Sequence, residues 1–323
     1  MSSVRLRAQQ KTGGRVVDIS MHSRVMGTWR HFAAWLPPEY GRSAKRLPVV
    51  YVFRGHHTEW QRRYTIPGGY ELLPEAPRLP LLDVWRVMEA LVRSRAVRPV
   101  ILVTPCMAND NGHLTGLATD WAAPERVSGR LTRGVGTGRF GTHLVEEIIP
   151  FVDRTFRTIA HRDGRATDGF SLGGFMSLKL AISQAHLFRC AGAYDGSFLY
   201  LHNRPGGEEE GDYLLNTGMF DPVFGRPRQP EHVFANSPTA LLARSPDSLL
   251  RSMTFHLQCG PQQAEPSDSN FYRTMHVTRL LQMRGVRNHA DPIVIEDGHH
   301  DWPTAFKHLA QALRCFSRVL ADG

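Results

Sequence analysis

The 323-residue chain has few cysteines and no long apolar run, and each shortage excludes a class of protein. The four cysteines lie far apart and form no C-x-x-C pair, so neither a disulfide framework nor a zinc module is expected. No stretch of about 18 consecutive apolar residues occurs, so no membrane span is expected. Buried, free thiols are therefore predicted at Cys106, Cys190, Cys259 and Cys315.

Lysine is scarce as well. The formal net charge is +9, but only four of the 39 basic residues are lysines, and the arginines are spread along the whole sequence. No recognised nucleic-acid motif accompanies them, so nucleic-acid binding is not expected. The first 20 residues are polar and charged and lack the apolar stretch of a secretory signal, which predicts a cytoplasmic protein. The sequence does not indicate an oligomeric state.

Strand-like and helix-like patterns alternate along the chain. β-prone apolar runs predict strands at residues 15–21, 27–36, 47–53, 97–105 and 188–194, within 249–259, and at 292–296. Helical spacing predicts helices at residues 81–94, 140–157, 270–283 and 304–320. Residues 58–80 are expected to be loop, and residues 198–236 a long, cap-like loop. The alternation predicts an α/β fold, a mostly parallel sheet with helices on both faces, in a single domain over residues 1–323.

A serine flanked by glycines carries the first sign of chemistry. Residues 169–173, GFSLG, fit the G-x-S-x-G nucleophile elbow, in which a strand turns sharply into a helix. Ser171 at the apex would adopt a strained backbone conformation, and the two glycines would remove side chains that collide where strand meets helix. The helix would point its free N–H groups toward the serine. Ser171 is therefore the candidate nucleophile.

A serine hydroxyl needs a base to take its proton and a third group to orient that base. In the α/β-hydrolase fold the chain order is serine, acid, histidine. Sixteen histidines are available, and two of them lie in residues 297–302, DGHHDW, between the last predicted strand and the last predicted helix. This position makes the loop the candidate source of the base.

Four segments together resemble the esterase D family, which includes S-formylglutathione hydrolases, feruloyl esterases, enterochelin esterases and mycobacterial mycolyltransferases. They are residues 26–40, which end in LPPEY, residues 47–55, LPVVYVFRG, residues 169–174, GFSLGG, and residues 298–302, GHHDW. The resemblance spans residues 15–320 and implies an α/β-hydrolase fold that needs no cofactor. Carried onto the last segment, it places the base at His300 and leaves His299 where the family has glycine.

The resemblance also implies where the acid and the oxyanion donors lie. It places the acid after the strand within 249–259, where an EP pair resembles the enterochelin esterases and favours Glu265. Asp268 is the alternative, and Asp195, after the preceding strand, is a more distant candidate. Two backbone N–H groups must hold the oxyanion, and they are predicted at Leu172 and His56.

Charges at two strand ends depart from the family pattern. Arg54 stands where the family has histidine or aspartate, and Asp168 stands where its central strand is apolar. These strands are neighbours in the fold, so an Arg54–Asp168 ion pair beneath the nucleophile is predicted. The doublets His56-His57 and His299-His300 lack helical i, i+4 spacing, and no metal is expected. The loops predicted to border the cleft carry three tryptophans, Trp60, Trp121 and Trp302.

Together these residues predict a serine esterase that hydrolyses a small-molecule carboxylic ester through an acyl-enzyme. Ser171 attacks, His300 moves the proton and Glu265 orients the imidazole. Two alternatives stay open: an acyltransferase that uses the same residues with an alcohol in place of water, and a non-catalytic binding protein on a hydrolase scaffold. The identity of the ester is not determined by the sequence.

Overall fold

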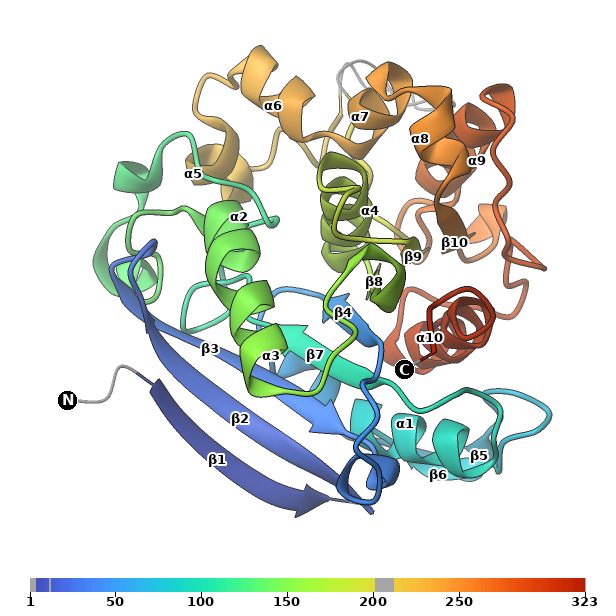
Figure 1. The fold of residues 1–323 in the computed structure, drawn as a ribbon. Helices are drawn as coiled ribbons and strands as arrows, with labels where there is room; N and C mark the ends of the chain where they lie inside the picture. The colour runs from blue at the N-terminus through green and yellow to red at the C-terminus, as the bar shows by residue number, and fades with distance from the viewer. Residues whose placement is uncertain (1–3, 12, 201–211, 323) are drawn as a thin grey trace.

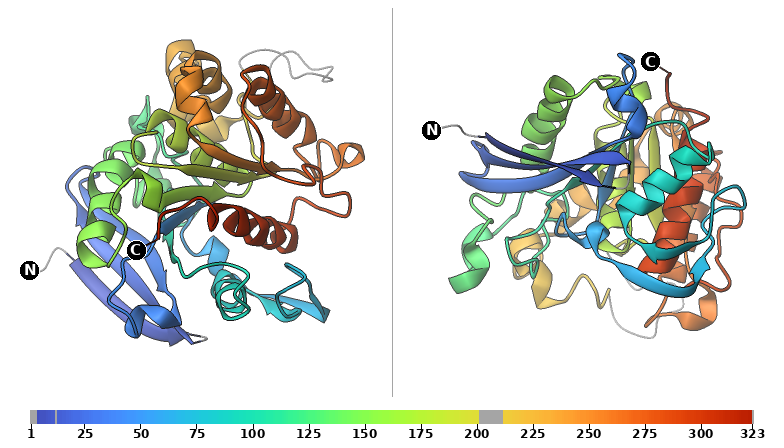
Figure 2. Two further views of the ribbon diagram at one scale, coloured as in Figure 1. Left: turned by 45° about the vertical axis from the view of Figure 1, so that its right-hand side comes forward. Right: turned by 90° about the horizontal axis from the view of Figure 1, so that it is seen from below.

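The computed structural model describes residues 4–11, 13–200 and 212–322. One eight-stranded sheet crosses the molecule, with helices on both of its faces (Figures 1 and 2). The strands are β1 (Val4–Lys11), β2 (Gly14–Ser23), β3 (Thr28–Leu36), β4 (Val49–Phe53), β5 (Tyr64–Tyr70), β6 (Leu79–Leu82), β7 (Ile101–Pro105), β8 (Arg165–Gly169), β9 (Cys190–Tyr194) and β10 (Thr254–Gln258). The helices are α1 (Val84–Arg93), α2 (Phe140–His143), α3 (Ile149–Thr155), α4 (Leu172–Ser183), α5 (Asp221–Phe224), α6 (Pro230–Asn236), α7 (Pro238–Arg244), α8 (Asp247–Arg251), α9 (Phe271–Met283) and α10 (Trp302–Phe316).

The sheet is mostly parallel, as predicted. Its strand order is β1-β2-β3-β7-β4-β8-β9-β10. The first three strands and the β3–β7 pair are antiparallel, whereas β7, β4, β8, β9 and β10 run parallel to one another. Parallel strands end at the same edge of a sheet, and the carboxyl edge is where open α/β sheets bind ligands. The residues that follow β4, β8 and β9 therefore meet at one place.

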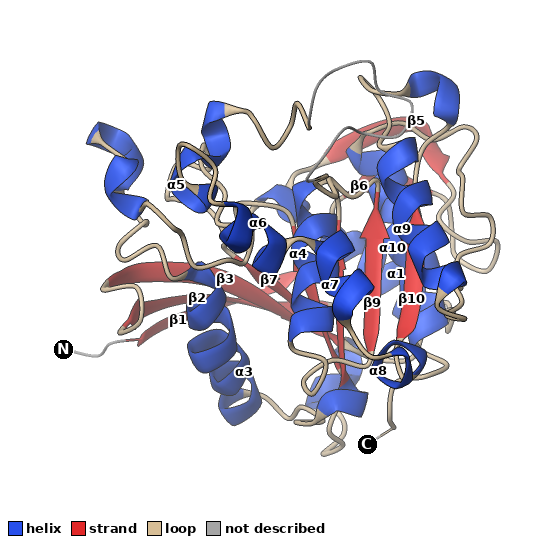
Figure 3. Cartoon of the chain, turned by 90° about the horizontal axis from the view of Figure 1, so that it is seen from above, coloured by secondary structure: helices blue, strands red, loops and turns tan. Residues whose placement is uncertain are grey.

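Apolar clusters on the two faces hold the helices to the sheet. The central strands are buried on both faces, which explains their continuous apolar runs. Helices α1 and α10 cover one face, with Leu91 and Leu313 in the cluster beneath them. Helices α3, α4 and α9 lie over the other face, with Val152, Leu178 and Val277 in its cluster (Figure 3). Loops occupy the carboxyl edge of the sheet.

Outside residues 198–236, two predicted segments differ from the structure and one strand was not predicted. Residues 58–80, expected to be loop, contain β5, which pairs with β6 in a separate two-stranded sheet. Strand β1 precedes the first strand that the pattern indicated. The strand expected at 292–296 is reduced to an isolated bridge between Val294 and Cys259. Pro292 has no N–H to donate to a ladder, which limits pairing at that end.

The predicted cap-like loop, residues 198–236, is partly helical. Its described part after residue 211 holds a 3-10 helix (Gly218–Phe220), α5 and α6. The prediction for residues 201–211 falls outside the described residues. Within the described ranges, no helix is both long and apolar enough to cross a membrane.

Candidate active site

Ser171 stands at the turn from β8 into α4, at the carboxyl edge of the sheet. Its φ of 58° and ψ of −118° lie in a region that non-glycine residues rarely adopt, at a cost of about 1–3 kcal/mol. Two backbone hydrogen bonds of 3.0 Å hold it there: Ser171 N donates to Tyr194 O, and Ser197 N donates to Ser171 O. Ser171 is 5% exposed. This is the backbone geometry that the G-x-S-x-G pattern predicts.

The two glycines of the pattern allow the strand and the helix to approach. A Cβ at Gly173 would collide with the carbonyl of Phe53 on β4, and a Cβ at Gly169 would collide with Gly173. Both positions therefore need glycine for close contact. The N–H of Leu172, the first residue of α4, donates no hydrogen bond among the described residues, so it is open at the helix N-terminus.

His300, in the loop before α10, uses both ring nitrogens. Its Nε2 lies 3.0 Å from Ser171 Oγ, and its Nδ1 lies 2.5 Å from Asp195 Oδ2. The Asp195 side chain is fully buried, and that of His300 is 26% exposed. The imidazole packs on Phe170, with ring centroids 4.7 Å apart. The structure thus brings Ser171, His300 and Asp195 together.

The carboxylate beside His300 is not the predicted one. Glu265 is expected to orient the imidazole, with Asp268 as the alternative, but Asp195 holds Nδ1. Asp195 follows β9, the direct neighbour of β8, whereas Glu265 and Asp268 follow β10, one strand further out. The end of β9 is therefore nearer to the serine. Neither Glu265 nor Asp268 therefore lies at His300 Nδ1, where the prediction put the acid, and the usable signal for Asp195 was an aspartate directly after the buried run of β9.

The segment after β10 donates hydrogen bonds to Asp195. Asp195 has a φ of 50°, and its Oδ1 accepts hydrogen bonds from Asn270 N at 2.8 Å and from Gly260 N at 3.3 Å. The side chain of Asn270 donates to Asp195 O at 2.9 Å. Two backbone donors and the imidazole thus compensate a fully buried carboxylate, as buried charges require.

Asp268 anchors the loop that carries the histidine. Its Oδ1 accepts from His300 N at 2.9 Å, and its Oδ2 lies 2.6 Å from His299 Nδ1. The hydrogen bond to Asp268 raises the pKa of His299, whose side chain is 65% exposed at the rim. The Tyr194 hydroxyl donates to His299 O at 2.7 Å. The peptide group between His299 and His300 is therefore held at both its N–H and its carbonyl.

The second predicted oxyanion donor is engaged. His56 N donates to Glu59 Oε1 at 2.7 Å. Glu59 begins a short 3-10 helix (Glu59–Gln61). Of the two predicted donors, Leu172 is open, whereas His56 is open only if Glu59 moves. An oxyanion at this place would compete with the carboxylate for the same N–H.

The predicted Arg54–Asp168 ion pair is wrong. Arg54 Nε lies 3.9 Å from Glu59 Oε2, and the guanidinium lies 5.4 Å from the centre of the Phe170 ring. Asp168 Oδ1 lies 3.4 Å from His308 Nε2 of α10, and both side chains are fully buried. Arg54 comes after the end of β4, whereas Asp168 lies within β8 with its side chain toward α10. In the register of β4 and β8, Val52 lies opposite Asp168, so Arg54 lies two residues further along and meets Phe170 instead.

The tryptophans mostly pack the loops. Trp60 is 1% exposed, with its ring centroid 5.1 Å from that of Trp302. Trp121 is 7% exposed and packs on Phe140. Trp302 packs on Phe170, the residue before Ser171, with ring centroids 5.3 Å apart.

Three possible metal ligands come together at the ends of β4 and β7. Ligand atoms of His56, His57 and Cys106 all lie within 4.8 Å of one another, the one such group among the residues that the structure describes. Burial lowers the pKa of His57 to about 4, so its ring is neutral near neutral pH.

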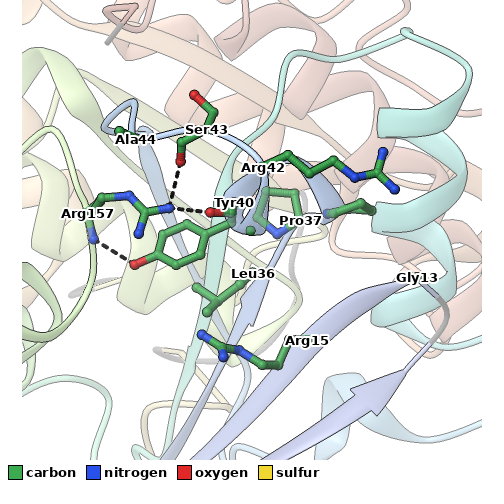
Figure 4. Close-up of a pocket in the computed structure, with 11 residues that line it drawn as sticks. Gly13, Arg15, Leu36, Pro37, Tyr40, Arg42, Ser43, Ala44 and Arg157 are labelled. Atoms are coloured by element: carbon green, nitrogen blue, oxygen red, sulfur yellow. Dashed lines mark hydrogen bonds between the residues drawn. The ribbon is translucent and has the colours of Figure 1, made fainter.

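A cavity of about 680 Å³ lies at the opposite, amino-terminal edge of the parallel strands, lined in part by Arg15, Tyr40 and Arg157 (Figure 4). The Arg157 guanidinium donates to Tyr40 O and to Ser43 O, and it lies 3.9 Å over the Tyr40 ring. Its charge therefore fixes the loop. The described residues that line this cavity include no histidine and no carboxylate, so it offers no counterpart to the site at the other edge.

Solved structures with this fold include hydrolases. A ferulic acid esterase has a TM-score of 0.66 and 21% identity, with 95% of this chain and 98% of that chain covered. An S-formylglutathione hydrolase from Agrobacterium tumefaciens has a TM-score of 0.66 and 14% identity, with 98% of this chain and 100% of that chain covered. At these identities the likeness concerns the fold.

Sequence comparison identifies the family. Esterase Rv1288 of Mycobacterium tuberculosis (strain ATCC 25618 / H37Rv) is 29% identical over 162 residues, which are 50% of this chain and 28% of that protein. The chain thus spans less than a third of the length of the curated relatives it matches. The Esterase family, whose description reads "Putative esterase", matches residues 23–315, and the chain belongs to this family.

Proposed function

We propose that the chain is a serine esterase that hydrolyses a carboxylic ester through an acyl-enzyme. The observation that supports this most directly is the hydrogen-bonded series from Ser171 through His300 to Asp195. It has the three roles that activate a serine: nucleophile, base and orienting acid. Membership of the Esterase family agrees with it.

In the proposed reaction, Ser171 Oγ attacks the ester carbonyl while His300 Nε2 takes the hydroxyl proton. Asp195 keeps the ring in position and stabilises the imidazolium. His300 then gives the proton to the departing alcohol, which leaves the acyl group on Ser171. In the second half, water attacks with His300 again as base, and the acid is released. Leu172 N–H, joined by His56 N–H when Glu59 has moved away, holds the oxyanion.

Labelling with a fluorophosphonate tests the nucleophile. We expect the probe to modify Ser171 in the folded protein and to leave the Ser171→Ala variant unmodified, as read by mass spectrometry of the labelled peptide. Ser197→Ala is the matched control, because its hydroxyl lies only 3.4 Å from Ser171 Oγ. Loss of the label in the Ser197→Ala variant would contradict the proposal. No labelling of the native protein would also contradict it and would favour a binding protein.

Product analysis tests the reaction. A panel of p-nitrophenyl esters of rising chain length, with a feruloyl ester and S-formylglutathione added because of the two solved hydrolases, should yield free acid. We expect a burst of p-nitrophenol before the steady state if the acyl-enzyme accumulates. Transfer of the acyl group to an added alcohol, with little free acid, would replace hydrolysis by acyl transfer.

A further inference from the structure

His56, His57 and Cys106 form a cluster that the esterase chemistry does not use, here called the His–Cys cluster. The two histidines follow β4, and Cys106 follows β7, the adjacent strand. The rings of His56 and His57 lie on the same side of the chain, with centroids 4.4 Å apart. All three ligand atoms lie within 4.8 Å of one another. The cluster therefore combines two imidazoles and a thiol from two elements.

The backbone around the His–Cys cluster is held from both sides. Met107 N donates to Gly55 O at 2.8 Å, which ties the residue after the thiol to the residue before the histidines. Cys106 N donates to His31 O at 3.2 Å, which ties the thiol to β3. Ligands on such a braced frame have little freedom to lose when they bind.

The polar atoms of the cluster make few hydrogen bonds to the described residues. His57 Nδ1 is buried and has no hydrogen-bond partner among the described residues, which costs about 1–3 kcal/mol for a buried polar group. The Cys106 thiol makes only a weak contact, Sγ to Ala108 O at 3.6 Å. His56 Nδ1 lies 2.7 Å from Thr58 Oγ1, and such an outer hydroxyl orients a ligating imidazole. The His57 ring and the Cys106 thiol are therefore weakly engaged by the described residues.

We propose that the His–Cys cluster binds a thiophilic divalent metal of the Zn²⁺ class. Imidazole and thiolate are the donors that select zinc over Mg²⁺ and Ca²⁺, which prefer oxygen. Cys106 releases its thiol proton to solvent as the sulfur–metal bond forms, and a water molecule completes the four-coordinate shell. Donors around zinc lie about 3.5–4 Å apart, so the cluster has to close by about 1 Å when the metal binds.

The positive charge of Arg30 lies near the cluster and opposes the binding of a cation. Arg30 donates to Cys106 O at 2.8 Å and to Ala108 O at 2.7 Å, and it is buried. A metal held by neutral ligands alone would face this charge without compensation. The thiolate supplies a negative charge at the site, so Cys106 is the ligand on which binding depends most.

The site has a consequence for catalysis that rests on the proposed function. His56 carries both a ligand and the N–H expected to hold the oxyanion. A metal on the ring fixes this loop in the arrangement in which His56 N is bound to Glu59. Ester hydrolysis should therefore fall as the site fills and recover when a chelator removes the metal.

Two titrations test the site. Zn²⁺ binding is measured by calorimetry, and Cd²⁺ binding is followed by the sulfur-to-metal absorption band. We expect one equivalent to bind, Mg²⁺ to fail, and Cys106→Ser to lose the absorption band and at least about tenfold in affinity. Cys315→Ser is the matched control, because Cys315 is the most accessible of the four free thiols. His56→Ala is a second variant at a partly exposed position, and thermal unfolding checks that each variant is folded.

The Ser171→Ala variant separates the site from the enzyme activity. Metal binding by this variant with native affinity would support the site even if no esterase activity were found. Native binding by Cys106→Ser, or an absorption band that disappears with Cys315, would overturn the site. Stoichiometric zinc binding that leaves hydrolysis unchanged would overturn the coupling between the metal and the His56 N–H.

Discussion

His300 uses Nε2 on Ser171 and Nδ1 on Asp195, so the ring has one productive orientation. Asp195 in turn is fixed by the N–H groups of Gly260 and Asn270. The Asp195 carboxylate is thus restrained by backbone groups outside the series from Ser171 to Asp195. The consequence is that a change of one atom at Asp195 should matter more than loss of a whole carboxylate at Glu265.

We expect Asp195→Asn to lower kcat by about 10⁴-fold with little change in KM, because the amide would favour the wrong imidazole tautomer. Steady-state kinetics on a p-nitrophenyl ester measure this. Glu265→Gln is the matched control and should keep kcat close to native. A loss in Glu265→Gln as large as that in Asp195→Asn would return the orienting role to Glu265.

Glu59 provides a second test at a single side chain. Its carboxylate accepts from the N–H of His56, and a charged acceptor binds more strongly than a neutral one by about 1 kcal/mol. Glu59→Gln should therefore free the donor more readily and raise kcat/KM by about fivefold. Glu71→Gln, on an exposed glutamate, serves as control. A fall in kcat/KM would instead assign Glu59 to support of the loop.

Helix α4 directly follows Ser171 and holds a buried lysine further along. Lys179 is 8% exposed, and its Nζ donates to Ala118 O at 2.7 Å. Burial lowers the pKa of Lys179 to about 8. Between this value and the unfolded pKa of about 10.4, the unfolded chain keeps the proton that the folded chain loses. The free energy of unfolding due to Lys179 therefore rises with pH in this window.

We expect the native protein to gain roughly 1–3 kcal/mol over Lys179→Met from about pH 8 to about pH 10. Urea unfolding at several pH values measures the difference, which cancels the titration of other groups. Lys45→Met, at an exposed lysine, should show no such trend. A difference that stays flat or falls with pH would contradict the burial of a charged ammonium.

At the scale of the whole molecule, a buried ion pair joins α9 to the segment that follows β9. Arg273 and Asp212 are both fully buried, with Nη2 2.7 Å from Oδ1 and Nη1 2.9 Å from Oδ2. Arg273 also donates to Phe198 O, and Tyr200 N donates to Asp212 Oδ2. One ion pair thus fixes chain on both sides of residues 201–211.

Arg273→Met should lower the free energy of unfolding by about 3–5 kcal/mol, because it leaves the carboxylate of Asp212 buried without its cation. Urea denaturation measures the loss. The double variant Arg273→Met/Asp212→Leu should recover most of it, since both charges are then gone. Arg279→Met, at an exposed position on the same helix, is the control, and an equal loss there would contradict the argument.

Much of the architecture was predictable because its signals are local. Continuous apolar runs indicated β4, β7 and β9, and helical spacing indicated α9 and α10, within a few residues of their bounds. The short hairpin of β5 and β6 escaped prediction because its strands are glycine-rich or only four residues long. A strand was predicted at residues 292–296, where the structure has one isolated bridge at Val294. The prediction failed because β-prone residues do not form a strand without a partner of matching length.

The sequence by itself determined the elbow at Ser171 and the loop of His300, because each is specified by residues close together in the chain. Only the tertiary structure decided that Asp195 faces the imidazole, that Asp168 meets His308 and that Cys106 joins two histidines. Several loops end at the same edge of the sheet, and the order of its strands selects which side chains come within hydrogen-bonding distance there. Strand order is a long-range property that no local pattern encodes.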